Sequence, residues 1–195
     1  METKMTVIVD NVAHGELAGE WGLSILVEYG GKNILVDAGA SALFAANMEK
    51  LGLDMAAVEY AVLSHAHYDH ANGMIRFFQG NNRAKFYVQQ AAREDCYGKR
   101  LCFRRYIGMP RGVLTDYADR IVRVSGKYEL LPGAYLLSHT TPGLAAIGAR
   151  QRMDRRTAQG RPRAGDPTIL PTSRVWCWKR TRAWSSSTAA PTAAR

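Results

Sequence analysis

The sequence predicts a layered α/β domain followed by a tail of different character. Short apolar segments typical of strands alternate with segments typical of helices, which is the order found in α/β folds. One of these apolar segments leads directly into a cluster of side chains that can bind metal. A length of 195 residues with 47% apolar residues suits one folded domain.

The N-terminal part is predicted to form strands. Residues 7–10, 23–29 and 33–37 are rich in apolar and β-branched side chains. Gly30 and Gly31 separate the second and third segments and are typical of a tight hairpin turn. We therefore expect an antiparallel pair early in the fold.

A helix is predicted after the third strand. Ser41 is a suitable N-terminal cap, and Phe44, Met48 and Leu51 recur at helical spacing on one face. Gly52 is a favourable residue just beyond a helix end. The apolar face of this helix is predicted to pack in the core.

A cluster of metal-capable residues follows the apolar segment 60–63. The run SHAHYDH at residues 64–70 places three imidazoles and a carboxylate within six positions, at His65, His67, Asp69 and His70. Imidazole nitrogen and carboxylate oxygen suit zinc, manganese and iron, and a tight loop can direct alternate side chains at two neighbouring ions. The run therefore predicts a dinuclear metal site at a strand end.

Beyond this run the sequence predicts a helix over residues 73–78, a strand over 85–88 and an irregular segment over 93–116. Basic and aromatic side chains interleave in the last segment: Arg93, Tyr97, Lys99, Arg100, Phe103, Arg104, Arg105, Tyr106 and Arg111. Such a segment can act as a lid that binds a phosphate or another anion. A solvated surface with scattered arginines explains the pattern equally well.

Three segments together resemble one family of proteins. They are EWGLS at residues 20–24, the strand ILV with DAG at 34–39, and LSHAHYDHANGM at 63–74. They resemble the metallo-β-lactamase fold, and within it the branch of dihydropterin ribofuranosylaminobenzene phosphate synthase-like proteins. The resemblance runs through the first three quarters of the chain. It implies a four-layer αββα sandwich, with the N-terminal half present and the C-terminal half incomplete.

The resemblance also implies roles for individual residues. His65 and His67 would bind one metal ion, and Asp69 and His70 would bind a second. Asp69 would in addition orient a catalytic water, so that a metal-bound hydroxide attacks a small substrate. Asp37, at the end of an earlier strand, would support the ligands from beneath, although an ordinary turn residue is an equally good interpretation.

The chain has fewer metal ligands than the intact family would use. A third histidine for the first site, a bridging carboxylate and a last histidine for the second site have no clear counterparts. Only His14 and His139 lie outside the motif, and Leu144 stands where a relative can have histidine. Two divalent ions are expected in the family, zinc first and manganese or iron as alternatives, but one or none in this chain.

The last quarter differs sharply in charge. Up to Ala149 there are fifteen basic and fifteen acidic residues, whereas from Arg150 onward there are eleven basic and two acidic ones. The codons of the run from Trp176 to Lys179 force Val-Leu-Glu in the frame shifted by one base. We therefore predict a partial domain over residues 1–153 and an aberrant, frameshifted tail over 154–195.

These observations favour a metallo-β-lactamase-fold hydrolase that is impaired or inactive as written, because the later metal ligands are missing. The alternatives are a nucleic-acid-binding protein that uses the basic tail and a non-catalytic domain with one metal ion or none. We expect a small-molecule substrate as the partner, neither nucleic acid nor membrane, and leave the oligomeric state open. The N-terminus has no secretory signal pattern or apolar span, which predicts a cytoplasmic location.

Overall fold

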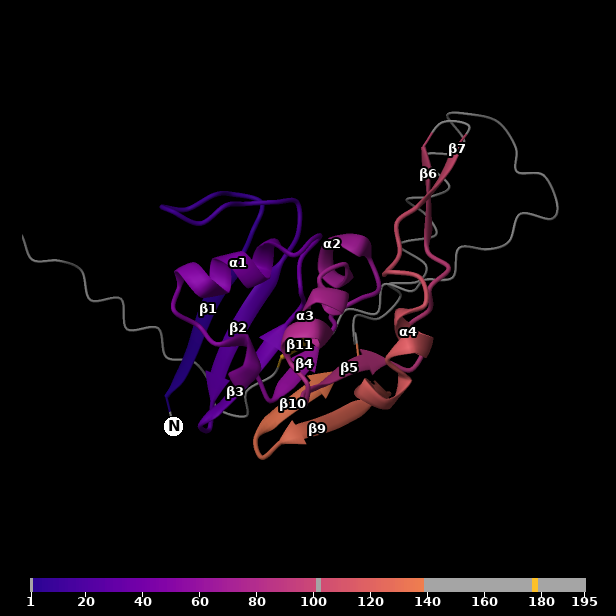
Figure 1. Cartoon of the computed structure of the whole chain (residues 1–195). Helices are drawn as coiled ribbons and strands as arrows, with labels where there is room; N and C mark the ends of the chain where they lie inside the picture. The colour runs from indigo at the N-terminus through magenta and orange to yellow at the C-terminus, as the bar shows by residue number, and fades with distance from the viewer. Residues whose placement is uncertain (1, 101–102, 139–176, 179–195) are drawn as a thin grey trace, which may run out of the picture.

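The computed structural model describes residues 2–100, 103–138 and 177–178 (Figure 1). In chain order its elements are β1 (Thr3–Val9), β2 (Ser24–Tyr29), β3 (Lys32–Val36), α1 (Leu43–Lys50), the 3-10 turn η1 (Met55–Ala57), β4 (Tyr60–Val62), α2 (Tyr68–Ala71), α3 (Met74–Gly80), β5 (Lys85–Gln89), β6 (Tyr97–Arg100), β7 (Phe103–Tyr106), α4 (Val113–Asp116), the 3-10 turn η2 (Ala118–Arg120), β8 (Ile121–Val124), β9 (Lys127–Leu131), β10 (Ala134–Leu137) and β11 (Cys177–Trp178).

The main sheet has six strands in the order β1-β2-β3-β4-β5-β8. The pairs β1–β2 and β2–β3 are antiparallel, and the pairs β3–β4, β4–β5 and β5–β8 are parallel. The carboxyl ends of β3, β4 and β5 therefore lie at one edge of the sheet. In open α/β sheets that edge is where ligands bind.

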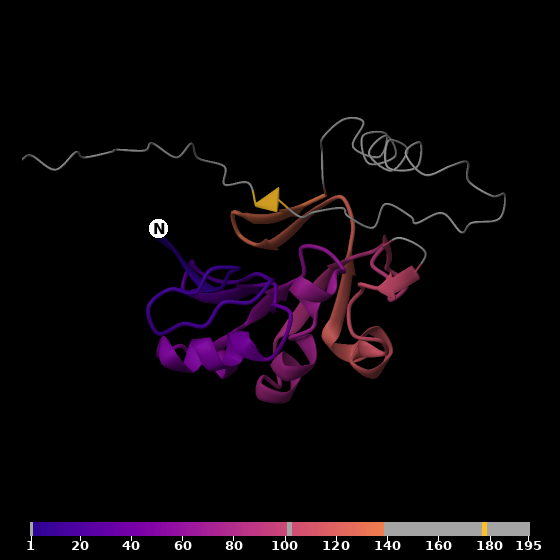
Figure 2. The same ribbon diagram turned by 90° about the horizontal axis from the view of Figure 1, so that it is seen from above.

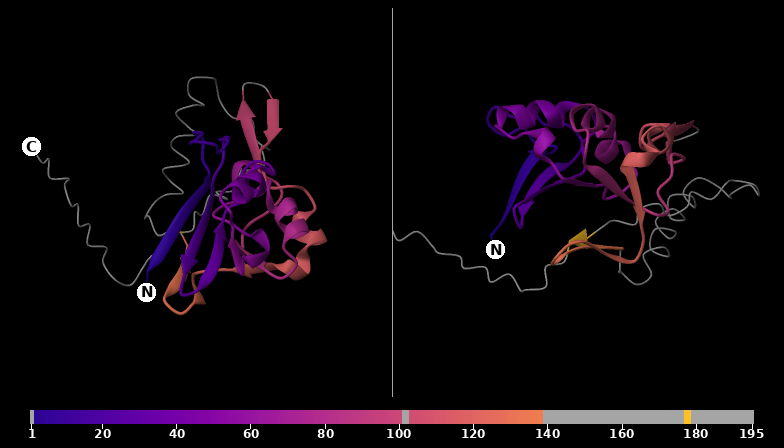
Figure 3. Two further views of the ribbon diagram at one scale, coloured as in Figure 1. Left: turned by 60° about the vertical axis from the view of Figure 1, so that its left-hand side comes forward. Right: turned by 60° about the horizontal axis from the view of Figure 1, so that its bottom comes forward.

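Two apolar clusters cover the two faces of this sheet. On one face, α1 and α3 pack through Phe44, Met48 and Phe77 against strand residues that include Leu35 and Phe86. On the other face, the β9–β10 hairpin packs through Leu130 and Leu136 against side chains of β2, β3, β4 and β8. Figures 2 and 3 show the resulting order of helices, main sheet and second sheet. The predicted α/β sandwich class is confirmed, with its N-terminal part present.

The early elements agree closely with the sequence prediction. Gly30 and Gly31 both adopt positive φ, of 58° and 74°, as a tight hairpin turn between β2 and β3 requires. With Ser41 as the cap, the helix was expected to begin at residue 42, and it begins one residue later, at Leu43. The backbone N–H of Leu43 donates to the Ser41 hydroxyl at 3.0 Å. The sequence pattern predicts Leu51 on the apolar face, but Leu51 is the C-terminal cap of the helix and its exposed fraction is 37%.

The sequence predicts an irregular segment over residues 93–116, but the structure shows regular elements there. It forms the antiparallel hairpin β6–β7, with Tyr97 opposite Tyr106, and then the short helix α4. The prediction missed the hairpin because its pairing depends on register rather than on a turn motif. In the predicted tail, Cys177 and Trp178 pair with β10, and the other residues of 154–195 lie outside the described part. None of the helices in the described ranges is long and apolar enough to cross a membrane.

Asn81 joins the helical layer to the sheet. Its side chain is buried, and its amide nitrogen donates to the carbonyls of Met55 and Val58 at 2.9 and 2.8 Å, while its oxygen accepts from the Ala84 N–H at 2.8 Å.

Asn81→Ala is expected to lower the free energy of unfolding by about 2–3 kcal/mol, because buried backbone groups lose their partners. Urea unfolding measures this effect, with the exposed neighbour Asn82→Ala as the control. Equal stability of the two variants would contradict the prediction.

Candidate metal centre

The SHAHYDH run lies where three segments of backbone meet. After β4 the chain turns over the end of β3, and the Asp37 N–H donates to the Val62 carbonyl at 2.9 Å. The Ala38 N–H donates to the carbonyl of His70 at 2.8 Å, and the Leu23 N–H donates to that of Asp69 at 3.2 Å. The run is therefore fixed by hydrogen bonds to the turn after β3 and to the start of β2.

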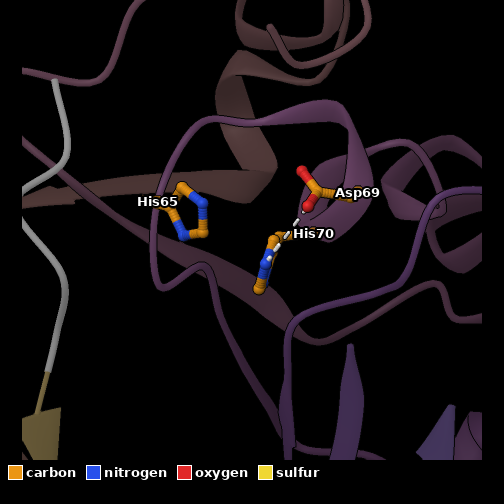
Figure 4. A group of neighbouring side chains, drawn as sticks. All are labelled: His65, Asp69 and His70. Atoms are coloured by element: carbon orange, nitrogen blue, oxygen red, sulfur yellow. Dashed lines mark ion pairs between the residues drawn. The ribbon is translucent and has the colours of Figure 1, made fainter. Parts of the chain in front are cut away.

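Three of the four predicted ligands come together at this point. His65, Asp69 and His70 each offer one ligand atom within 4.8 Å of the other two. The Nε2 atom of His70 lies 3.7 Å from Oδ2 of Asp69, and Figure 4 shows the three side chains around a common space. His67 is not part of this group, although its ring centroid is 4.6 Å from that of His65.

Asp37 contacts one of the candidate ligands, His70, directly. Its carboxylate is completely buried, and Oδ2 lies 2.7 Å from Nδ1 of His70. The backbone N–H and the hydroxyl of Ser64 both donate to this carboxylate at 2.7 Å. Asp37 also has a φ of 59°, which is unusual for a residue other than glycine. A carboxylate on Nδ1 fixes the ring and leaves Nε2 of His70 directed at Asp69.

Ser64, for which the sequence pattern predicts no role, links Asp37 to His65. Its oxygen lies 3.0 Å from Nδ1 of His65. Because the Ser64 hydroxyl donates to Asp37, its oxygen can accept a hydrogen from Nδ1 of His65, which leaves Nε2 of that ring without a hydrogen. The signal in the sequence was a hydroxyl residue directly before the first histidine at a strand end.

The three histidines have different proton affinities. Burial, followed by the charges of His70 and His67, lowers the pKa of His65 to about 4. Burial also lowers the pKa of His67. For His70, burial acts to lower the pKa, but the hydrogen bond and charge of Asp37 together with the charge of Asp69 outweigh it, so that the pKa is raised. At neutral pH His65 is therefore a neutral imidazole, the form that binds metal.

The other two histidines are placed differently. His14 lies in the exposed loop after β1, where it forms a bridge with Leu17, and it is not part of the group around Asp69. His139 lies outside the described residues. The group in the described residues thus consists of side chains from the single run 64–70, supported by Asp37.

The arrangement can be compared with known proteins. The model of the metallo-beta-lactamase superfamily matches residues 22–154, which is more than half of the chain. The chain belongs to the metallo-beta-lactamase superfamily. The match includes the turn after β3, the SHAHYDH run and the strands from β2 to β10, whereas β1 lies before it.

Individual relatives of this superfamily member cover only part of it. An uncharacterized protein of Methanocaldococcus jannaschii, MJ0448, is 32% identical over 103 residues, which are 53% of this chain and 39% of that protein. The crystal structure of Tm1679, described as a metal-dependent hydrolase of the beta-lactamase superfamily, is similar with a TM-score of 0.51 and 24% identity. The similarity covers 72% of this chain and 49% of Tm1679. The chain therefore spans about two fifths to one half of the length of these relatives.

Proposed function

We propose that this chain is a metal-dependent hydrolase that holds divalent metal through His65, His67, Asp69 and His70. The observation that carries the proposal is the convergence of three of these side chains within 4.8 Å, with Asp37 on the far nitrogen of His70. A carboxylate behind a metal-binding histidine is the usual support in metal sites.

The donor set is chemically suited to such an ion. Two imidazoles and a carboxylate match zinc best and also suit manganese or iron. His65 is neutral at pH 7, because its pKa lies at about 4. A divalent ion bound here would supply a nucleophilic water at neutral pH and polarise the bond to be broken.

The residues of the chain have distinct tasks in this proposal. Asp37 keeps the hydrogen of His70 on Nδ1, and Ser64 does the same for His65. Asp69 would help to hold the ion, and its carboxylate would accept a hydrogen bond from a water molecule and orient that water toward the substrate. The substrate is proposed to be small and anionic, and the EWGLS and DAG segments favour the dihydropterin ribofuranosylaminobenzene phosphate synthase-like branch. We propose a cytoplasmic location.

Zinc binding by the full chain tests the first part of this proposal. We expect about one equivalent after dialysis, since the described part of the chain gathers three candidate ligands in one group. His65→Ala is expected to weaken binding by about tenfold or more, because one coordinate bond is lost. His14→Ala is the control and should bind zinc like the parent chain. Elemental analysis and competition with a chromophoric chelator give stoichiometry and affinity.

Activity tests the second part. A panel of chromogenic esters and phosphodiesters is assayed with zinc and again after chelation. Turnover that depends on zinc and is lost in Asp69→Asn would support the proposal. A chain that binds no zinc, or turnover that survives both chelation and this substitution, would contradict it.

We further propose that residues 154–195 are translated from a shifted reading frame. The abrupt change from balanced to strongly basic charge after Ala149 supports this proposal. The nucleotide sequence of codons 150–170 tests it. Aligned with the coding sequence of a family member that has an intact domain, this stretch is expected to show one inserted or deleted base. A reading frame shared by the two genes without interruption would contradict the proposal.

A further inference from the structure

A segment far along the chain pairs with the backbone of the SHAHYDH run. We call residues 106–109 the bridging segment. The Tyr68 N–H donates to the Ile107 carbonyl at 3.0 Å, and the Met109 N–H donates to the Ala66 carbonyl at 3.1 Å. Figures 1 and 3 show the hairpin β6–β7 projecting from the body of the domain, and the bridging segment begins at the last residue of β7.

His67 lies in the middle of this pairing. It stands opposite Gly108 in an antiparallel bridge, with one of the two hydrogen bonds on each side of the pair. In such a pair the two Cα atoms approach to about 4.5 Å. His67 has an extended backbone, with φ −92° and ψ 152°, and its ring centroid lies 4.6 Å from that of His65. The pairing therefore fixes the direction in which the His67 imidazole leaves the backbone.

The bridging segment is also held from its other side. The Ile107 N–H donates to the Cys96 carbonyl at 3.0 Å, while the Ile107 carbonyl accepts from Tyr68. Met109 is fully buried in the apolar cluster beneath the helices. Because Ile107 is bonded on both sides and Met109 is buried, the bridging segment gives the SHAHYDH run a fixed support.

A tyrosine closes the bridging segment. The Tyr106 hydroxyl donates to the carbonyl of Met109, three residues further on, at 2.5 Å. A Cβ added to Gly108 would lie 2.7 Å from the hydroxyl oxygen of Tyr106 and 2.8 Å from its Cζ, so the phenol packs directly against Gly108. Burial and the charge of Glu94 raise the pKa of Tyr106, which keeps the hydroxyl protonated at neutral pH. Tyr106 therefore remains a hydrogen-bond donor to Met109.

We propose that Tyr106 is a positioning residue for the candidate metal centre. Its hydroxyl closes the bridging segment, the bridging segment pairs with residues 66–68, and that pairing keeps the His67 imidazole beside His65. Tyr106 acts through the backbone and is not a ligand. The consequence for metal binding rests on the proposed hydrolase function, whereas the support of residues 66–68 does not.

Amide hydrogen exchange of the full chain without metal, followed by NMR, tests this support. Tyr106→Phe deletes the hydroxyl and keeps the ring, over which the Arg111 guanidinium lies. We expect the Tyr68 and Met109 N–H groups to exchange about fivefold faster, as expected for the loss of one neutral hydrogen bond. The Asp37 N–H, which is bonded at the end of the main sheet, should exchange as in the parent chain.

Metal binding tests the consequence for the candidate site. Tyr106→Phe is expected to weaken zinc binding by about threefold, because a looser run must be ordered when the ion binds. The chain loaded with cobalt(II) gives a second readout, since its visible absorption depends on how the ligands are placed around the ion. The absorption band should shift in Tyr106→Phe, and a loss of stability alone would not move it.

Tyr29→Phe is the matched control. The Tyr29 hydroxyl also donates to a backbone carbonyl, that of Pro132 at 3.2 Å, which lies between β9 and β10. This variant should keep the exchange rate of the Tyr68 N–H, the zinc affinity and the cobalt absorption of the parent chain.

Gly108→Ala tests the same contact from the other side. The backbone at Gly108 is not left-handed, so alanine is strained there only by its contact with Tyr106. Its Cβ would displace the Tyr106 hydroxyl from Met109, and we expect the changes seen in Tyr106→Phe. The double variant should be no weaker in zinc binding than the weaker single variant, because both substitutions remove one bond.

Several results would overturn the proposal. These are parent-like exchange of the Tyr68 and Met109 N–H groups in Tyr106→Phe, an equal acceleration that includes the Asp37 N–H, or equal effects in Tyr29→Phe. Faster local exchange with parent-like zinc affinity and cobalt absorption would also overturn it. If the parent chain binds neither metal while exchange is faster only at Tyr68 and Met109, the hydrolase function is contradicted and the support by Tyr106 is confirmed.

Discussion

Asp37→Asn is expected to weaken zinc binding by about 10- to 100-fold while the fold is retained. The buried carboxylate accepts from Nδ1 of His70 and from two groups of Ser64. An amide in its place presents N–H groups to His70, which would move the ring hydrogen from Nδ1 to Nε2 and block the atom that faces Asp69. Asparagine tolerates a φ of 59°, so the backbone need not move.

A chelator competition titration measures this loss of affinity, and nitrogen chemical shifts of the imidazole report which ring atom carries the hydrogen. Asp54→Asn is the matched control, because Asp54 is an exposed cap that accepts from the Ala56 N–H at 2.8 Å, at the 3-10 turn η1. It should bind zinc like the parent chain. Parent-like zinc affinity in Asp37→Asn, with the hydrogen still on Nδ1, would refute the proposed role of Asp37.

Gly73→Ala is expected to cost about 3 kcal/mol or more of the free energy of unfolding, because overpacking against backbone forces the chain to shift. A Cβ at this position would lie 2.0 Å from the carbonyl oxygen of Ala38 and 2.8 Å from Cε1 of Phe44. Ala38 and Phe44 are fully buried, so neither can move aside easily. Because the Ala38 N–H also donates a hydrogen bond to the His70 carbonyl, the shift would reach the SHAHYDH run.

Urea unfolding followed by circular dichroism gives the stability of this variant. Gly52→Ala is the control, because a Cβ there meets nothing within 4 Å and the position has a φ of 66°. Its cost should be about 1 kcal/mol, from the left-handed backbone alone. If the two substitutions cost the same, close packing at Gly73 is not what holds the turn and the loop together.

The sequence predicted those parts of the fold that are specified locally. Gly30 and Gly31 can adopt the positive φ that a tight hairpin turn requires, and the helical spacing of Phe44 and Met48 favours α1. The strands from β8 to β10 and the hairpin β6–β7 were not predicted, because their pairing partners are chosen by register and by burial against other elements. Tyr97 lies opposite Tyr106, and the sequence between β6 and β7, Leu101 and Cys102, contains no glycine, asparagine or proline that would predict a hairpin.

The same distinction holds within the candidate metal centre. The spacing of His65, Asp69 and His70 predicts a shared site because one short loop carries all three, and their ligand atoms lie within 4.8 Å of one another. The position of His67 apart from that group depends on its extended backbone, with φ −92° and ψ 152°, and on its bridge to Gly108. The contact between Asp37 and His70 joins residues 33 positions apart, so spacing alone left two interpretations open.

Within the part of the chain that the structure describes, the hydrogen bonds that hold the SHAHYDH run come from residues between Leu23 and Met109. On the ribosome, the nascent chain therefore contains both partners of each of these hydrogen bonds before its final third has been synthesised. Changes confined to that final third would leave these bonds in place.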